Sequence, residues 1–154
     1  ALQQDNADLT REAALALEDM GNRSEDKLAD LRRKADNLPS FETAFTAGAA
    51  HAAAVFSELA DPSLAAPLML NARRYLQLAL EFDPSSSFAL EQLARVELAA
   101  LKPDVAVEFA KEALERNRDP NRHEALDMLL RECAQLSRRF ELLPYTTQVT
   151  HVIS

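Results

Sequence analysis

The sequence predicts an all-α protein, and three observations lead to this prediction. First, the 154-residue chain is 47% hydrophobic, has only two glycines and no tryptophan, and is rich in alanine, the strongest helix former. Second, apolar residues recur at helical spacing in most segments. Third, a pattern of alanine, leucine and aromatic residues returns after 34 residues. One domain is expected at this length.

About seven helices are expected, most of them bounded by capping or breaking residues. A first helix over residues 8–20 carries an apolar stripe and stops at Gly21. Ser24 caps a second, charged helix that runs to about residue 35, and Ser40 caps a third. From this third helix onward, the expected helices span residues 41–60, 66–82, 86–101, 103–117 and 121–140.

The helix expected over residues 41–60 has almost no large side chains in its middle. Its small residues are Ala44, Ala47, Gly48, Ala49, Ala50 and Ala52 to Ala54. Small residues allow a neighbouring helix to approach closely, or they leave room for a bound peptide. Of these two alternatives, close packing within the chain is favoured.

A repeat with a period of 34 residues runs through residues 56–115. It relates Phe56-x-x-Leu59-Ala60 to Leu90-x-x-Leu93-Ala94, Ala72 to Ala106, and Tyr75-x-x-x-Ala79-Leu80-Glu81 to Phe109-x-x-x-Ala113-Leu114-Glu115. A fixed period of this size is typical of helix pairs that bury their apolar faces by stacking on one another.

These residues resemble the tetratricopeptide repeat (TPR). The resemblance covers residues 56–84 and 90–120, and the two segments end in Asp83-Pro84 and Asp119-Pro120. It implies a TPR-like right-handed stack of helical hairpins. The sequence departs from the family pattern because the tight turn within each pair lacks Gly or Asn, and Pro67 and Pro103 stand near the start of each second helix instead.

Three parts of the chain are expected: an N-terminal helical extension (1–39), a TPR-like helical repeat domain (40–143) and a short extended C-terminal tail (144–154). The tail is rich in β-branched and aromatic residues, which favour extended chain. It is either disordered or a strand of a further domain. Alternatively, it docks in a groove, its own or that of a neighbouring copy, or pairs with a partner's sheet edge.

Composition argues against several classes of function. The net charge of −8 disfavours a nucleic-acid backbone or an anionic membrane as partner, and no apolar run is long enough for membrane insertion. No glycine-rich phosphate loop exists, and His51, His123 and His151 show no metal-ligand spacing. Cys133 lies on an apolar helical stripe, as expected of a buried structural thiol. We therefore expect no enzyme, no cofactor and no metal site.

The compartment is left open by the sequence. A lone cysteine excludes an internal disulfide but does not indicate a redox environment. The chain starts at Ala1 rather than at methionine, as expected of either a processed protein or an excised fragment.

The resemblance implies a partner-binding groove lined by the first helix of each pair. Its expected residues are Ala54, Ser57, Asp61, Phe88, Glu91, Arg95, Leu98, Asp127, Arg131 and Gln135. The family's lysine/asparagine clamp for a terminal carboxylate is absent, because Ser57, Glu91 and Asp127 stand where its lysines would be. Phe88 and Leu98 as apolar anchors, with Arg95 as a polar contact, suit an amphipathic helix or an extended peptide. Alternatively, Phe88 packs against the preceding helix pair.

Two functions follow from this reading. The first is a non-catalytic protein–protein interaction module, adaptor-like or chaperone-like, that binds a peptide or helix of a partner. The second is a structural or assembly subunit that is buried in a larger complex or self-associates through its tail. The second is open because two recognisable repeats are fewer than the three or so that such stacks usually need.

Overall fold

The predicted all-α class is confirmed by the structure, a computed structural model that describes the backbone of residues 25–153 and the side chains up to residue 142. Within this part of the chain there are six α-helices and no strand. The helix expected over residues 8–20, its stop at Gly21 and the cap expected at Ser24 lie outside the described residues. The helices are α2 (Glu25–Asn37), α3 (Phe41–Ser57), α4 (Pro62–Phe82), α5 (Ser87–Ala99), α6 (Pro103–Arg116) and α7 (His123–Ile153), with a 3-10 turn, η1 (Pro120–Arg122), before the last.

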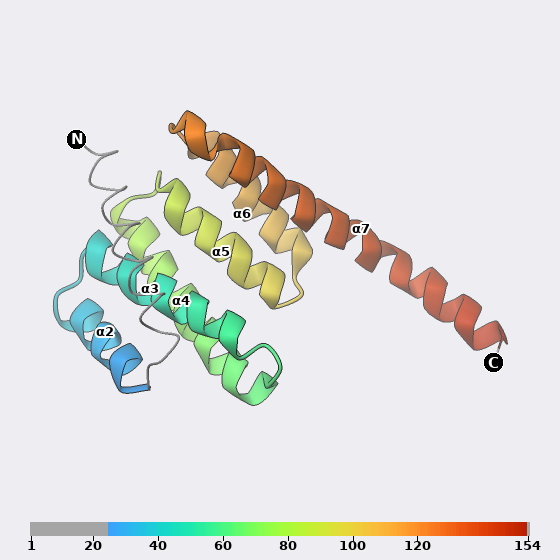
Figure 1. Cartoon of the computed structure of the whole chain (residues 1–154), viewed down its shortest axis with the longest axis horizontal. Helices are drawn as coiled ribbons and strands as arrows, with labels where there is room; N and C mark the ends of the chain where they lie inside the picture. The colour runs from blue at the N-terminus through green and yellow to red at the C-terminus, as the bar shows by residue number, and fades with distance from the viewer. Residues whose placement is uncertain (1–24, 154) are drawn as a thin grey trace.

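Consecutive helices run in opposite directions and pack side by side (Figure 1). The α3–α4 and α5–α6 hairpins and the α6–α7 pair make the most extensive contacts, α5 also packs on both α3 and α4, and α2 packs on α3. Short connections, of three or four residues between successive helices from α2 to α6, favour antiparallel neighbours and produce this arrangement.

Serine side chains cap α3, as the sequence predicts, and α5. Ser40 and Thr43 form a capping box, in which the Thr43 N–H donates to Ser40 Oγ at 3.1 Å and the Ser40 N–H donates to Thr43 Oγ1 at 3.0 Å. Ser86 accepts from the Ala89 N–H at 3.2 Å and caps α5. Pro103 occupies the first position of α6, as expected, where a missing N–H costs little. The expected place of Pro67 near a helix start is wrong, because α4 begins at Pro62 and Pro67 lies inside it.

The contact between α3 and α4 is close because α3 presents small residues to α4. A Cβ atom added to Gly48 would lie 2.6 Å from Leu76 Cγ and 2.9 Å from the Leu76 backbone nitrogen. Ala44, Phe45 and Leu76 then share one buried cluster with residues of α5. The preference for close packing within the chain, rather than room for a peptide, is confirmed at Gly48.

Residues 34 positions apart have matching burial on the second helices of the two hairpins, α4 and α6, but not on the first helices, α3 and α5. Ala72, Ala106, Ala79 and Ala113 are all fully buried. On α5, Leu90, Leu93 and Ala94 are buried, whereas their counterparts are exposed: Phe56 near the end of α3, and Leu59 and Ala60 in the connection to α4. The physical reason is hairpin length: α3 and α4 have 17 and 21 residues, but α5 and α6 have 13 and 14.

The prediction of an extended tail from residue 144 is wrong. α7 continues through Pro144 to Ile153, and its C-terminal half projects beyond the other helices (Figure 1). The strand preference of β-branched residues depends on neighbouring strands, and the described residues offer no sheet. Extending a helix that already exists requires no new nucleation, so the chain continues as helix.

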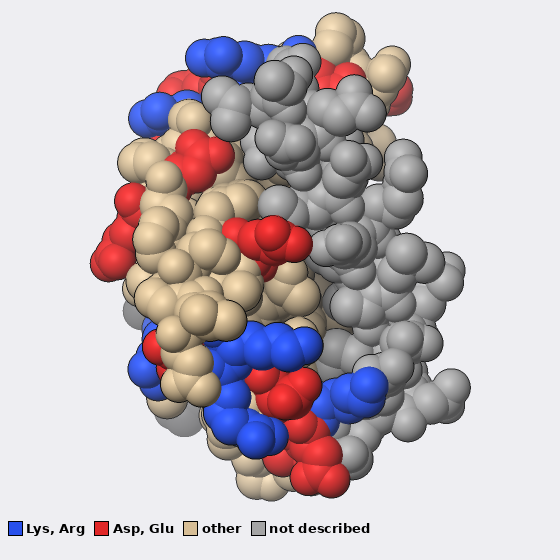
Figure 2. Space-filling model, turned by 90° about the vertical axis from the view of Figure 1, so that its left-hand side faces the viewer, with Lys and Arg blue, Asp and Glu red and all other residues tan. Residues whose placement is uncertain are grey.

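The outer faces of the described stack are polar. Exposed charged residues cover both terminal helices: Glu25, Asp26, Lys27, Asp30, Arg33 and Lys34 on α2, and Arg131, Glu132, Arg138, Arg139 and Glu141 on α7. In Figure 2, acidic and basic side chains are interleaved above and below an uncharged belt on the described part of one side. Polar outer faces of this kind end a helical stack.

Leu101 offers a test of strain in the α5–α6 turn. It has a left-handed backbone (φ 61°) although its side chain is 62% exposed and gains little from burial. Because glycine adopts this conformation without a steric penalty, Leu101→Gly should raise the free energy of unfolding by about 1 kcal/mol in urea denaturation. Leu70→Gly, at an equally exposed site inside α4, should lower it by about 1 kcal/mol. A loss of stability in both variants would contradict the strain at Leu101.

Gly48 tests the close approach of α3 and α4. Alanine is normally the better helix former, yet Gly48→Ala should lower the free energy of unfolding by about 1–3 kcal/mol because the added methyl meets Leu76. Thermal denaturation of Gly48→Ala, Leu76→Ala and the double variant measures the coupling. The double variant should be more stable than the sum of the single effects predicts. Strict additivity would show that Leu76 is not what the methyl meets.

Candidate protein-binding face

The face predicted to bind a partner belongs to α3, α5 and α7, which follow one another across the molecule (Figure 1). Its centre is Glu91 on α5. Glu91 accepts a hydrogen bond at 3.1 Å from Arg95, one turn later on the same helix, and pairs with Arg122 of η1. The Glu91 and Arg122 side chains are largely buried, so the pair is poorly screened by solvent.

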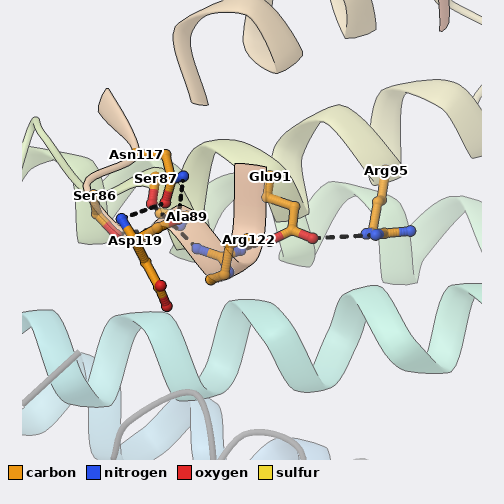
Figure 3. A network of polar contacts seen from close by, with 8 residues as sticks. All are labelled: Ser86, Ser87, Ala89, Glu91, Arg95, Asn117, Asp119 and Arg122. Atoms are coloured by element: carbon orange, nitrogen blue, oxygen red, sulfur yellow. Dashed lines mark hydrogen bonds and ion pairs between the residues drawn. The ribbon is translucent and has the colours of Figure 1, made fainter. Parts of the chain in front are cut away.

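Arg122 joins three groups at the junction of η1 and α5. It donates to Glu91 and, at 3.3 Å, to Ser87 Oγ, and its guanidinium lies 3.9 Å from the centroid of the Phe88 ring. Figure 3 shows Arg122 reaching from η1 toward α5, with Arg95 on the far side of Glu91. Since arginine donates in a fixed planar fork, this contact sets both the position and the direction of the chain entering α7.

The loop before η1 is held by its own side chains. The Asn117 amide donates to the Asp119 carbonyl at 2.8 Å, and the Asp119 N–H donates to Asn117 Oδ1 at 3.2 Å (Figure 3). Asp119 in turn accepts from the Asn121 N–H at 3.0 Å, which starts the 3-10 turn. These local bonds present Arg122 to α5.

The predicted residues on α5 and α7 form two charged pairs, one on each helix. Glu91 and Arg95 form one pair, and Asp127 and Arg131 form the other at 2.9 Å. Arg95 is partly exposed, Arg131 is largely exposed and Gln135 is exposed. The face therefore offers acidic and basic groups in turn.

Two predicted residues belong to the core as much as to this face. Phe88 is half-buried and packs against the cluster that contains Ala44 and Phe45, so the alternative that it packs on the preceding pair is confirmed. Leu98 packs against the cluster around Ala106 and Cys133. The accessible part of the face is consequently more polar than the sequence suggested.

The residues expected in the first repeat lie at the end of α3 and in the connection to α4. Ala54 is half-buried in the last turns of α3, and Ser57 is its exposed final residue. The expected place of Asp61 on the first helix is wrong, because Asp61 is the N-cap of α4. Its carboxylate accepts from Ser63 Oγ at 2.6 Å, and this bond holds the pKa of Asp61 below its usual value. Pro62 explains the boundary, since a residue before proline disfavours the helical conformation.

Arg122 was missed by sequence reasoning. It lies 31 residues from Glu91 in the chain, and nothing in the local pattern marks it. Only the packing of η1 against α5 brings the two together.

The single cysteine of the chain is buried. Cys133 is fully buried, as predicted, and burial raises the pKa of its thiol, which disfavours the reactive thiolate. Among residues 25–142, no cluster of three or more His, Cys, Asp or Glu side chains is placed to hold a metal ion. None of the described helices is long and apolar enough to cross a membrane.

Comparisons with protein-family models, with curated proteins and with solved structures found no match for this chain.

Two substitutions compare the contribution of Arg122 to stability with that of an exposed arginine, Arg131. Arg122→Met should lower the free energy of unfolding by about 1.5–3 kcal/mol, because it leaves the largely buried Glu91 with only one partner. Arg131→Met removes an exposed ion pair on α7 and should change stability by less than about 0.5 kcal/mol. Urea denaturation of both variants provides the comparison. Equal effects would mean that Arg122 does not fix η1 on α5.

Proposed function

We propose that this chain is a non-catalytic protein–protein interaction module, built as a TPR-like right-handed stack, that binds a peptide or helix of a partner across α5 and α7. The helix order supports the stack. Each helix from α3 to α7 packs on its successor, α3 also packs on α5, and the second helices α4 and α6 bury equivalent alanines.

One observation carries the binding proposal: a stripe of partly open polar side chains on α5 continues onto α7. Arg95 donates to Glu91 through one Nη atom, and its side chain is 41% exposed. An arginine has five N–H donors, so Arg95 retains donors for a second acceptor such as a peptide carbonyl or carboxylate. Asp127 and Arg131 provide the matching acceptor and donor one helix further on.

These side chains suit a short polar peptide or the polar face of an amphipathic helix. Helices α5 and α6 hold the stripe rigidly, because Leu90 and Ala113 behind it are buried. A single peptide of modest size on such a face should bind with micromolar strength, about −8 kcal/mol.

A structural or assembly subunit is the second candidate, and a specific observation favours it. Six large apolar side chains are exposed at the end of the stack where the hairpins turn and α7 projects: Phe56, Leu59, Leu64, Leu101, Val105 and Leu142. Together with the projecting half of α7 (Figure 1), they could be covered by another subunit. Light scattering of the whole chain separates the two functions, since the module acts as a monomer and the assembly subunit does not.

Charge reversal at Arg95 tests the module. Peptides selected from a displayed random library on the whole chain serve as probes, and their affinity is measured by fluorescence anisotropy. Arg95→Glu should weaken binding at least tenfold, about 1.4 kcal/mol, without unfolding the chain. Arg33→Glu, on the outer face of α2, is the matched control and should leave affinity unchanged. If both variants bind like the parent chain, the partner uses another surface.

A further inference from the structure

His51 on α3 has no part in the proposed function, and its surroundings define its protonation state. The residue is fully buried. Its Nδ1 lies 2.7 Å from the Ala47 carbonyl oxygen, and its Nε2 lies 2.9 Å from Nη1 of Arg32 on α2. A carbonyl only accepts and a guanidinium only donates, so Nδ1 carries the proton and Nε2 accepts. His51 is therefore a neutral imidazole whose Nε2 accepts a hydrogen bond from Arg32.

The same region contains the other contacts that hold α2 on the α3–α4 hairpin. The Tyr75 hydroxyl donates to Asp36 at 2.9 Å, and Arg74 lies 3.8 Å from the same carboxylate. The Tyr75 ring stacks on His51 with centroids 6.1 Å apart. Ala35 of α2 is buried against Tyr75 and Ala47. The imidazole thus lies between α2 and the face that α2 covers.

We propose that α2 is a proton-sensitive cover of the α3–α4 hairpin, which detaches when protonation of His51 replaces its hydrogen bond with Arg32 by a repulsion between two cations. No acceptor would remain at Nε2, because the imidazolium and the guanidinium both only donate. Nε2 of His51 and Nη1 of Arg32 lie 2.9 Å apart, so the two positive charges would be close together in a poorly solvated site.

Other charged groups near His51 do not cancel this repulsion. Glu25 pairs with the far side of Arg32 at 2.6 Å, but its side chain is 65% exposed and solvent screens it. Asp36 is engaged by Tyr75 and Arg74, which both come from α4. With α2 in place, burial is the main cause that holds the pKa of His51 below its ordinary value of 6.5. The bond to Ala47 opposes the shift, Arg32 adds to it, and Glu25 opposes it.

The direction of the pH effect follows from this linkage. With α2 detached, the His51 imidazole reaches solvent and regains an ordinary pKa near 6.5. The detached state therefore binds more protons than the covered state below that pH, so acid favours detachment and α2 is most firmly held above it. Release would uncover the small-residue face of α3 around Ala47 and the ring of Tyr75.

Hydrogen exchange of the whole chain, followed by mass spectrometry, tests the cover. When the pH falls from about 7.5 to about 5.5, a histidine of ordinary pKa, such as His51 with α2 detached, takes up a proton. The opening constant of α2, corrected for intrinsic exchange rates, should therefore rise about tenfold. Protection of α6 should change by less than about twofold, because α2 opens without global unfolding. Equal loss in both helices, or none in α2, would overturn the proposal.

Variants identify the group that takes up the proton. His51→Gln keeps a neutral polar side chain and should make the protection of α2 independent of pH, whereas His123→Gln, at an exposed site, should behave like the parent chain. Persistence of the tenfold change in His51→Gln would rule out His51. If His51→Gln does not fold, His51→Met provides the decision: a thioether takes up no proton, so the pH dependence of α2 should again be lost, and an unchanged dependence would refute the mechanism.

Discussion

The close contact between α3 and α4 is the constraint on which the rest of the structure depends. Gly48 brings the backbone of α4 within van der Waals distance of α3, at a place where even a methyl group would collide with Leu76. Once the two helices are joined at this distance, their combined surface accepts α5 on one side and α2 on the other. Alanines can build this hairpin because their small side chains let the two helix backbones approach closely, so the interface is still densely packed.

Polar links across successive helix boundaries then set the register of the stack. Arg32 and His51 join α2 to α3, Arg73 and the buried Glu97 join α4 to α5, and Glu91 and Arg122 join α5 to η1. In the described part of the chain, no buried side-chain nitrogen or oxygen lacks a partner. A buried charge without its partner is costly, so each link penalises a shifted arrangement of the helices that it joins. Alanine surfaces alone, being smooth and alike, would discriminate poorly between such arrangements.

The same links bear on function in two different ways. The link between Glu91 and Arg122 holds the polar stripe on α5 and leads into α7, so the binding that we propose there would act on a surface fixed by this contact. The link between Arg32 and His51 includes a titratable group, and the proposed response of α2 to acid depends on it. In these proposals a fixed face and a releasable edge lie on different pairs of helices.

Sequence reasoning by itself determined the helical class, most helix boundaries after residue 39, the buried cysteine and the burial of alanines on the second helices. These follow from local causes: propensity, capping by Ser40 and Ser86, and apolar spacing within one helix. Tertiary structure alone decided the rest. The greater length of the α3–α4 hairpin removed Phe56 and Leu59 from the core despite their matching pattern, and the absence of a sheet among the described residues left α7 helical to Ile153. Arg122 reached Glu91, and Arg32 reached His51, because contacts between distant residues depend on how helices pack, which no local pattern encodes.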